Sequence, residues 1–173
     1  MNDYNKISPK ELNQNPFTMF HKDWALITAG TIDSYNTMTA SWGGVGVLWN
    51  KDVATIYIRP QRYTYEFIEK NELFTISIFP EDYKKALNFC GKFSGRDYDK
   101  AKEADITPVE VDGSTTFKEA RLVFVCKKLY HSDINPEHFY DREIEKNYTL
   151  KDYHRMYIGE IVSAYIKCED QTV

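Results

Sequence analysis

The sequence predicts a mainly β fold, a β-barrel with short flanking helices, from three observations. Of the 173 residues, 13 are Tyr and 10 are Phe, and aromatic side chains fit the half-buried face of a β-sheet. Short β-prone runs recur along the chain, and short helical patterns interrupt them. Most neighbouring strands are not separated by a helix of ten or more residues, so the pattern does not fit alternating βαβ units. The chain length and the 42% apolar content suit one domain, residues 1–173, with a substantial core.

The expected strands are apolar runs with β-prone side chains. Phe74–Phe79, with the sequence FTISIF, is the clearest buried strand. Around Gly43 and Gly44 the chain is expected to form either a strand pair or one bent strand. The expected strands, in chain order, are Trp24–Thr31, Asn36–Trp42, Val45–Trp49, Val53–Ile58, Phe74–Phe79, Arg121–Leu129 and Met156–Lys167.

Three helices are expected between these strands. One begins at Pro60, because proline suits the first turn of a helix, and ends near Asn71. A second covers Pro80–Phe89, with Gly91 as its stop signal. The charged segment Asn135–Tyr148 can hold a third helix, with Pro136 near its first turn.

Charge and composition narrow the classes of function. The net charge is −4, whereas a surface for nucleic acid usually carries a basic stripe. The first residues, MNDYNKISPKEL, contain no apolar stretch, so we expect no signal peptide. No apolar run approaches the roughly 20 residues that cross a bilayer, and we expect no membrane partner.

Cysteine and histidine spacing does not predict a metal site. The cysteines are Cys90, Cys126 and Cys168, and the histidines are His21, His131, His138 and His154. Neither set contains a CxxC motif or an i, i+4 histidine pair. Three reduced thiols in a cytoplasmic protein are the plainest interpretation.

The glycine cluster is not a dinucleotide-binding motif. In GGVGVLW the position of the third glycine is taken by Trp49, and the residues that follow are β-like rather than a helix start. These glycines indicate a bulge or a close backbone approach instead.

The segment Asn36–Trp42 combines short hydroxyl side chains with an aromatic ring. A planar ring with carbonyl and N–H groups needs a flat apolar wall and a few polar groups at its rim. Thr39 and Ser41 offer the rim and Trp42 the wall. A plain Thr-rich strand with its hydroxyls in water is the alternative, and the residues alone favour it.

Two further segments carry positive charge beside predicted turns. Arg59 and Arg62 flank a predicted helix N-terminus, where a phosphate is favoured; the alternative is an exposed turn with solvated arginines. The loop Cys90–Lys100 carries Lys92, Arg96 and Lys100 and can wrap an anion, although a plain helix-capping loop explains it equally well.

Together these segments resemble the flavin reductase-like family of FMN-binding split barrels, which includes flavoredoxin and the short-chain flavin reductases. Four motifs carry the resemblance, in this order: Asn36-x-Met38-Thr39-Ala40-Ser41-Trp42-Gly43, Arg59-Pro60-x-Arg62-Tyr63-Thr64, Cys90-Gly91-x-x-Ser94-Gly95-Arg96-Asp97-x-Asp99-Lys100, and His154-x-x-x-x-Gly159-Glu160-Ile161. The resemblance runs from about Trp24 to Ile166. Asn135–Tyr148 matches no motif of the family.

The resemblance implies a six-stranded antiparallel split barrel, a homodimer, and FMN near the dimer interface. By position, the isoalloxazine ring would be lined by Thr39, Ala40, Ser41 and Trp42, and the ribityl phosphate and ring edge by Arg59, Arg62, Tyr63 and Thr64. Ser94, Arg96 and Lys100 would close over the cofactor, and His154 would approach the ring. Lys100 and His154 are the candidate catalytic residues, because a cation at the N1–C2 edge stabilises the reduced ring.

The leading hypothesis is therefore an oxidoreductase that passes electrons from NAD(P)H through FMN to an acceptor. One alternative is an electron carrier that keeps FMN bound and uses a redox protein partner, as flavoredoxin does. Another is a non-catalytic FMN-binding module.

Overall fold

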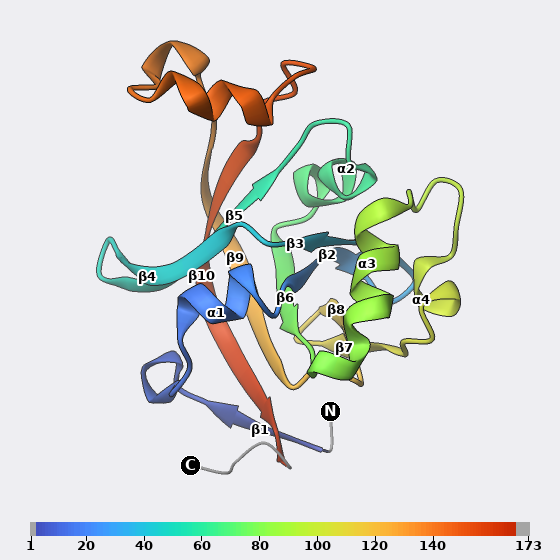
Figure 1. Ribbon diagram of the computed structural model, residues 1–173. Helices are drawn as coiled ribbons and strands as arrows, with labels where there is room; N and C mark the ends of the chain where they lie inside the picture. The colour runs from blue at the N-terminus through green and yellow to red at the C-terminus, as the bar shows by residue number, and fades with distance from the viewer. Residues whose placement is uncertain (1–2, 169–173) are drawn as a thin grey trace.

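The computed structural model describes residues 3–168, so both ends of the predicted domain, residues 1–173, lie outside the described residues. Within them, an 8-stranded antiparallel sheet has the order β3-β2-β6-β9-β10-β5-β4, and β1 pairs with β10 (Figure 1). Its strands are β1 (Tyr4–Ile7), β2 (Ala25–Thr31), β3 (Ser34–Ala40), β4 (Gly43–Leu48), β5 (Lys51–Ile58), β6 (Leu73–Ile78), β9 (Leu122–Asp133) and β10 (Arg155–Lys167). The strands β7 (Pro108–Val111) and β8 (Ser114–Phe117) form a separate hairpin. The mainly β, antiparallel class that the sequence predicts is confirmed.

The strand count exceeds the six that the resemblance implied. The extra pairing arises because β10 is long: its first half pairs with β5, and its second half, near Ala164, pairs with β1. β1 is short and largely polar, and the sequence did not predict it as a strand.

The chain around Gly43 does not form a strand pair. β3 pairs with β2, β4 pairs with β5, and the chain bends between them at Ser41 and Trp42. A Cβ atom at Gly43 would lie 2.5 Å from the ring of Phe20, so the glycine permits the close approach of the helix α1 (Pro16–His21).

Two predicted helices have different bounds in the structure. The helix α2 spans Tyr63–Lys70 rather than beginning at Pro60, because Arg62 is still extended (φ −71°, ψ 132°). After Pro80 comes the 3-10 turn η2 (Glu81–Tyr83), and the helix α3 then spans Lys84–Lys92. Gly91 is therefore inside α3 and does not end it. The short helix α4 (Lys100–Glu103) follows, and η1 (Pro9–Glu11) precedes α1.

The segment between β9 and β10 extends beyond the sheet in Figure 1. Instead of the single helix predicted over residues 135–148, it holds two 3-10 turns, η3 (Pro136–His138) and η4 (Arg142–Asn147). No helix formed by residues 3–168 is long and apolar enough to cross a membrane.

Both faces of the central strands are covered. Ile27 and Phe124 belong to one core cluster, whereas their neighbours Leu26 and Val123 belong to another, as the alternation of side chains along a strand requires. The second cluster includes Leu87 of α3. This packing sets α3 beside β2 and β3, where the candidate site lies.

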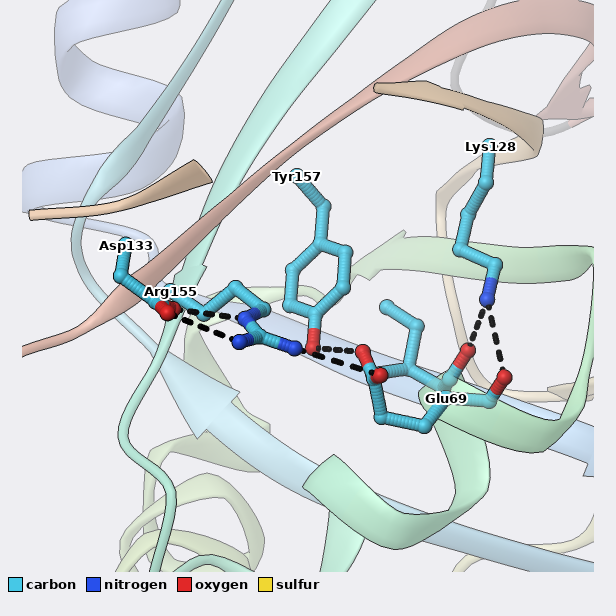
Figure 2. A network of polar contacts seen from close by, with 6 residues as sticks. Glu69, Lys128, Asp133, Arg155 and Tyr157 are labelled. Carbon is cyan, nitrogen blue, oxygen red and sulfur yellow. Dashed lines mark hydrogen bonds and ion pairs between the residues drawn. The ribbon is translucent and has the colours of Figure 1, made fainter. Parts of the chain in front are cut away.

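A polar network fixes the start of β10 against α2 and β9 (Figure 2). The Tyr157 hydroxyl donates to Glu69 Oε1 over 2.6 Å, and Arg155 Nη1 lies 3.3 Å from Glu69 Oε2. Arg155 also binds both carboxylate oxygens of Asp133, over 2.6 and 2.8 Å. Lys128 Nζ donates to the main-chain oxygen of Glu69 over 3.2 Å. These contacts hold the backbone that directly follows His154.

Candidate functional site

Strand β3 and the segment after α3 meet along one side of the site. A Cβ atom at Gly95 would lie 1.9 Å from Asn36 Oδ1, and one at Gly91 would lie 3.2 Å from the Thr39 Cβ. Asn36 is buried and its amide is hydrogen-bonded to Thr64, 2.7 Å away, at the start of α2. Two glycines of the third motif thus allow it to pack directly on the first motif.

Six of the predicted residues line one pocket of about 140 Å³, called the ring pocket below. They are Thr39, Ala40, Ser41, Trp42, Arg59 and His154, and Met38 and Tyr57 complete the lining. Trp42 is 42% exposed, and its ring lies 5.0 Å from that of His154. The Ser41 hydroxyl has no partner within residues 3–168, whereas the Thr39 hydroxyl donates to the Leu87 carbonyl oxygen. The pocket therefore offers a flat aromatic wall at Trp42 and, at Ser41, a hydroxyl available to a ligand.

Five more predicted residues line a second pocket of about 130 Å³, called the anion pocket. They are Arg62, Tyr63, Thr64, Ser94 and Lys100, together with Met38, Gln61, Lys92 and Phe93. Met38 lines both pockets, so the two are neighbours along β3.

The anion pocket opens at the N-terminus of α2. Arg62 is the N-cap residue and its side chain does not cap the helix; instead, Arg62 Nη2 donates to the Gly91 carbonyl oxygen over 2.6 Å. Burial, and then the positive charge of Arg59, lower the pKa of the Arg62 guanidinium. An anion bound here would offset both effects, and a helix N-terminus favours one as well.

His154 is a neutral imidazole at the edge of the ring pocket. It is 8% exposed, and its Nδ1 lies 3.0 Å from the Tyr148 hydroxyl. Burial, followed by the charge of Arg59, lowers the pKa of His154 to about 4. At neutral pH this side chain therefore offers a hydrogen bond rather than the positive charge that the sequence suggested.

Lys100 is a buried lysine between β3 and α3. Its Nζ donates to the carbonyl oxygens of Thr37 and Cys90, each over 2.8 Å. Burial lowers its pKa to about 8, and the charge of Arg62 acts in the same direction. Two of its three ammonium protons are used within the fold, which leaves one for a ligand in the anion pocket.

Two predicted arginines are paired with acidic residues. Arg59 Nη1 binds Asp152 Oδ2 over 2.6 Å, although Arg59 also lines the ring pocket. Arg96 forms an ion pair with Glu66 and lies over the ring of Tyr63, 4.5 Å from its centroid. Arg96 lines neither pocket, so the structure brings it beside the site rather than into it.

A larger hollow of about 680 Å³ adjoins the ring pocket between α1 and β4. Phe17, Phe20 and Val45 contribute apolar surface, and Ser41 and Trp42 line both the hollow and the ring pocket. Its volume lies within the usual range for small-molecule sites. Sequence reasoning missed this hollow, because α1 had not been predicted.

Other lining residues that were not predicted lie close to the motifs in the sequence. Tyr57 lies two residues before Arg59 at the end of β5, and residues two apart point to the same face of a strand. Met38, Lys92 and Phe93 lie inside the motifs. Tyr148 had no such signal, because the fold of the segment before β10 brings it to His154.

A family model described as the flavin reductase like domain matches residues 18–172. The chain belongs to the flavin reductase-like family. The match of the family model confirms the predicted family membership. Among the curated proteins, no match to the chain is found.

Solved structures of flavin reductase-like proteins share the fold. The FMN-binding domain of a flavin reductases-like enzyme from Shewanella baltica OS155 matches with a TM-score of 0.71 and 16% identity, over 98% of this chain and 80% of that one. Flavoredoxin of Desulfovibrio vulgaris (Miyazaki F) matches with a TM-score of 0.66 and 23% identity, over 94% of this chain and 77% of that one. An NADH:FAD oxidoreductase from Streptomyces globisporus C-1027 matches with a TM-score of 0.61 and 15% identity, over 82% of this chain and 73% of that one.

Proposed function

We propose that this protein binds FMN and is an NAD(P)H-dependent flavin oxidoreductase. The observation that carries the proposal is the adjacency of two pockets along β3: one has an aromatic wall, and the other lies at a helix N-terminus beside Arg62. A flat ring joined by a polar chain to a phosphate has the chemistry that this pair of pockets would take. The FMN-binding members among the structural neighbours support the proposal.

The charged and polar side chains at the two pockets fit the groups that FMN carries. Arg62 and Arg59 repel each other across the site, and Arg62 has one hydrogen-bond acceptor within the described chain, the Gly91 carbonyl oxygen. A phosphate beside Arg62 would supply the missing counter-charge. At the other end, the free Ser41 hydroxyl and the exposed indole of Trp42 suit a planar polar ring.

Bound flavin would supply hydride acceptance and electron transfer, and the residues of the chain would orient it and exclude water. Trp42 and Ser41 would hold the ring, and Arg62 with the first turn of α2 would hold the phosphate. Lys100, at the border of the anion pocket, would contribute positive charge below its pKa of about 8.

The nicotinamide would enter from the large hollow between α1 and β4. That hollow meets the ring pocket at Ser41 and Trp42. It is open and mostly apolar, which suits a loosely held donor whose nicotinamide stacks on the ring face. An electron acceptor could use the same opening once the donor has left.

One assay separates this function from its alternatives. The purified protein is mixed with NADH or NADPH, with free FMN and without it, and nucleotide oxidation is followed by absorbance. Turnover with added FMN supports the reductase. FMN binding with no turnover by either nucleotide identifies a carrier or a binding module instead. Of these two, only the carrier would exchange electrons with a redox protein partner.

We also propose that the protein is a homodimer. Trp49 and Tyr130 form an exposed aromatic contact, with ring centroids 6.2 Å apart, and they are 54% and 47% exposed. Val47 and Leu48 extend this surface along β4, and Val47 is 74% exposed. Exposed apolar surface of this kind is typical of an interface, and we call it the β4 patch, residues Val47–Trp49 with Tyr130.

A further inference from the structure

The segment Asn135–Tyr148, which matches no family motif, contacts a residue that lines the ring pocket. Tyr148, at the end of η4, is 5% exposed, and its hydroxyl lies 3.0 Å from His154 Nδ1. His154 in turn lines the pocket and lies against Trp42. A side chain of this segment is therefore one hydrogen bond away from a residue that lines the pocket.

Arg59 holds Tyr148 in place. Its Nη1 donates to Asp152 over 2.6 Å, and its Nη2 donates to the Asn147 carbonyl oxygen over 2.8 Å. The guanidinium also lies over the Tyr148 ring, 5.2 Å from the centroid. Arg59 thus binds Asn147 and Asp152, which precede and follow Tyr148 in the chain, and packs on the Tyr148 ring between them.

The protons at this contact can be assigned from the partners available. The Tyr148 hydroxyl has no other hydrogen-bond acceptor within residues 3–168, so its proton is used only if it donates to His154 Nδ1. The other ring nitrogen, Nε2, has no hydrogen-bond partner within residues 3–168, and it is not fully buried. Nε2 is therefore accessible from the pocket that His154 lines.

We propose that Tyr148 is a positioning residue: by donating to Nδ1 it fixes the tautomer of His154 in which Nε2 carries the proton and donates to an acceptor atom of the ring-pocket ligand. The identity of that ligand as a flavin rests on the proposed function above. The tautomer itself is a property of the chain without any ligand.

Burial, together with the charges around His154, keeps this imidazole neutral. Arg59 from the end of β5 and Arg62 at the start of α2 repel a positive imidazole, while Asp152 partly offsets them. Tyr57, also from β5, lines the same pocket. Because burial acts in the same direction as the arginines, the pKa of His154 lies at about 4, and the neutral donor persists across the physiological pH range.

The test is nitrogen NMR of the histidine rings in the full chain, measured at pH 7 without ligand. In the parent protein, His154 should show a protonated Nε2 and an unprotonated Nδ1. In Tyr148→Phe the Nδ1–H form should appear as well, and the pKa of His154 should rise, because the lost hydroxyl stabilised the neutral ring. Tyr153→Phe is the matched control: it removes a hydroxyl of the same segment that bonds Glu145 at 3.2 Å instead, and it should leave His154 unchanged.

A second measurement relates the tautomer to the ligand. FMN affinity should fall roughly threefold to tenfold in Tyr148→Phe, the effect of weakening one neutral hydrogen bond, and should be unchanged in Tyr153→Phe. An Nδ1-protonated His154 in the parent, or an unchanged tautomer in Tyr148→Phe, overturns the proposal. Failure of the parent to bind FMN refutes the proposed function instead, and the ligand-free spectra distinguish the two failures.

Discussion

Lys100 Nζ lies 2.8 Å from the carbonyl oxygen of Thr37. This hydrogen bond joins the end of the loop Cys90–Lys100 to β3, the strand that carries the first motif. The lysine is 6% exposed, and its second bond, to the Cys90 carbonyl oxygen, reaches α3. One buried ammonium group therefore ties together three segments of the site, and it does so at a cost in desolvation.

That cost should appear in the pH dependence of stability. The pKa of Lys100 in the folded protein is about 8, compared with an ordinary value of 10.5, so between these values the unfolded chain holds a proton that the folded protein has released. The free energy of unfolding should then rise with pH across this window, by up to about 3 kcal/mol from this group. Below pH 8 the group is charged in both states, so it adds no slope there.

Urea unfolding of the parent and of Lys100→Met, at several pH values between 7 and 10.5, isolates this contribution. The advantage of the parent over the variant should grow with pH, because methionine does not titrate. Lys102→Met, an exposed neighbour on α4, should show no such trend. A pH-independent difference for Lys100→Met would mean that Lys100 keeps its ordinary pKa.

Arg62 should distinguish the phosphate from the ring. Charge-assisted hydrogen bonds contribute roughly 1.5–3 kcal/mol, so Arg62→Ala should weaken FMN by about tenfold to a hundredfold. Riboflavin, which lacks the phosphate, should bind the variant and the parent alike, and fluorescence quenching measures both. Arg142→Ala, which removes the same charge from the exposed turn η4, is the control. An equal loss for riboflavin would assign Arg62 to the ring or to the fold.

Gly95→Ala should loosen the third motif from β3. The added Cβ would lie 1.9 Å from Asn36 Oδ1, and Asn36 cannot yield without losing its bond to Thr64. We expect a loss of about 1–3 kcal/mol in the free energy of unfolding, the usual cost of overpacking. Gly46→Ala, where nothing lies within 4 Å of the new Cβ, should change stability far less. Equal stability of both variants would show that the loop can move away from Asn36.

The β4 patch should hold the dimer together. Trp49→Lys places a charge in the patch, beside Tyr130, and should yield the 20.3 kDa monomer, whereas the parent should sediment as a dimer. Tyr140→Lys is a control at an exposed aromatic residue of η3–η4 outside the patch, and it should remain dimeric. A monomeric parent that still binds FMN tightly would contradict the proposed assembly.

The sequence by itself determined the fold class and most strand positions, because these follow from local alternation and composition. Phe74–Phe79 was predicted within one residue of β6. The structure then brings eleven of the twelve predicted site residues to two adjoining pockets, and their binding roles stay predictions. Local pattern could not assign helix starts as reliably: the extended backbone of Arg62, rather than the proline before it, sets where α2 begins.

Only the tertiary structure decided which charges remain available to a ligand. Arg59 and Arg62 look equivalent in the sequence, but Arg59 pairs with Asp152, 93 residues away, while Arg62 stays at the anion pocket. His154 was expected as a source of positive charge, and the burial and the two arginines around it keep it neutral instead. Ion pairing and desolvation depend on which distant segments meet, and the periodicity of a single segment carries no information about them.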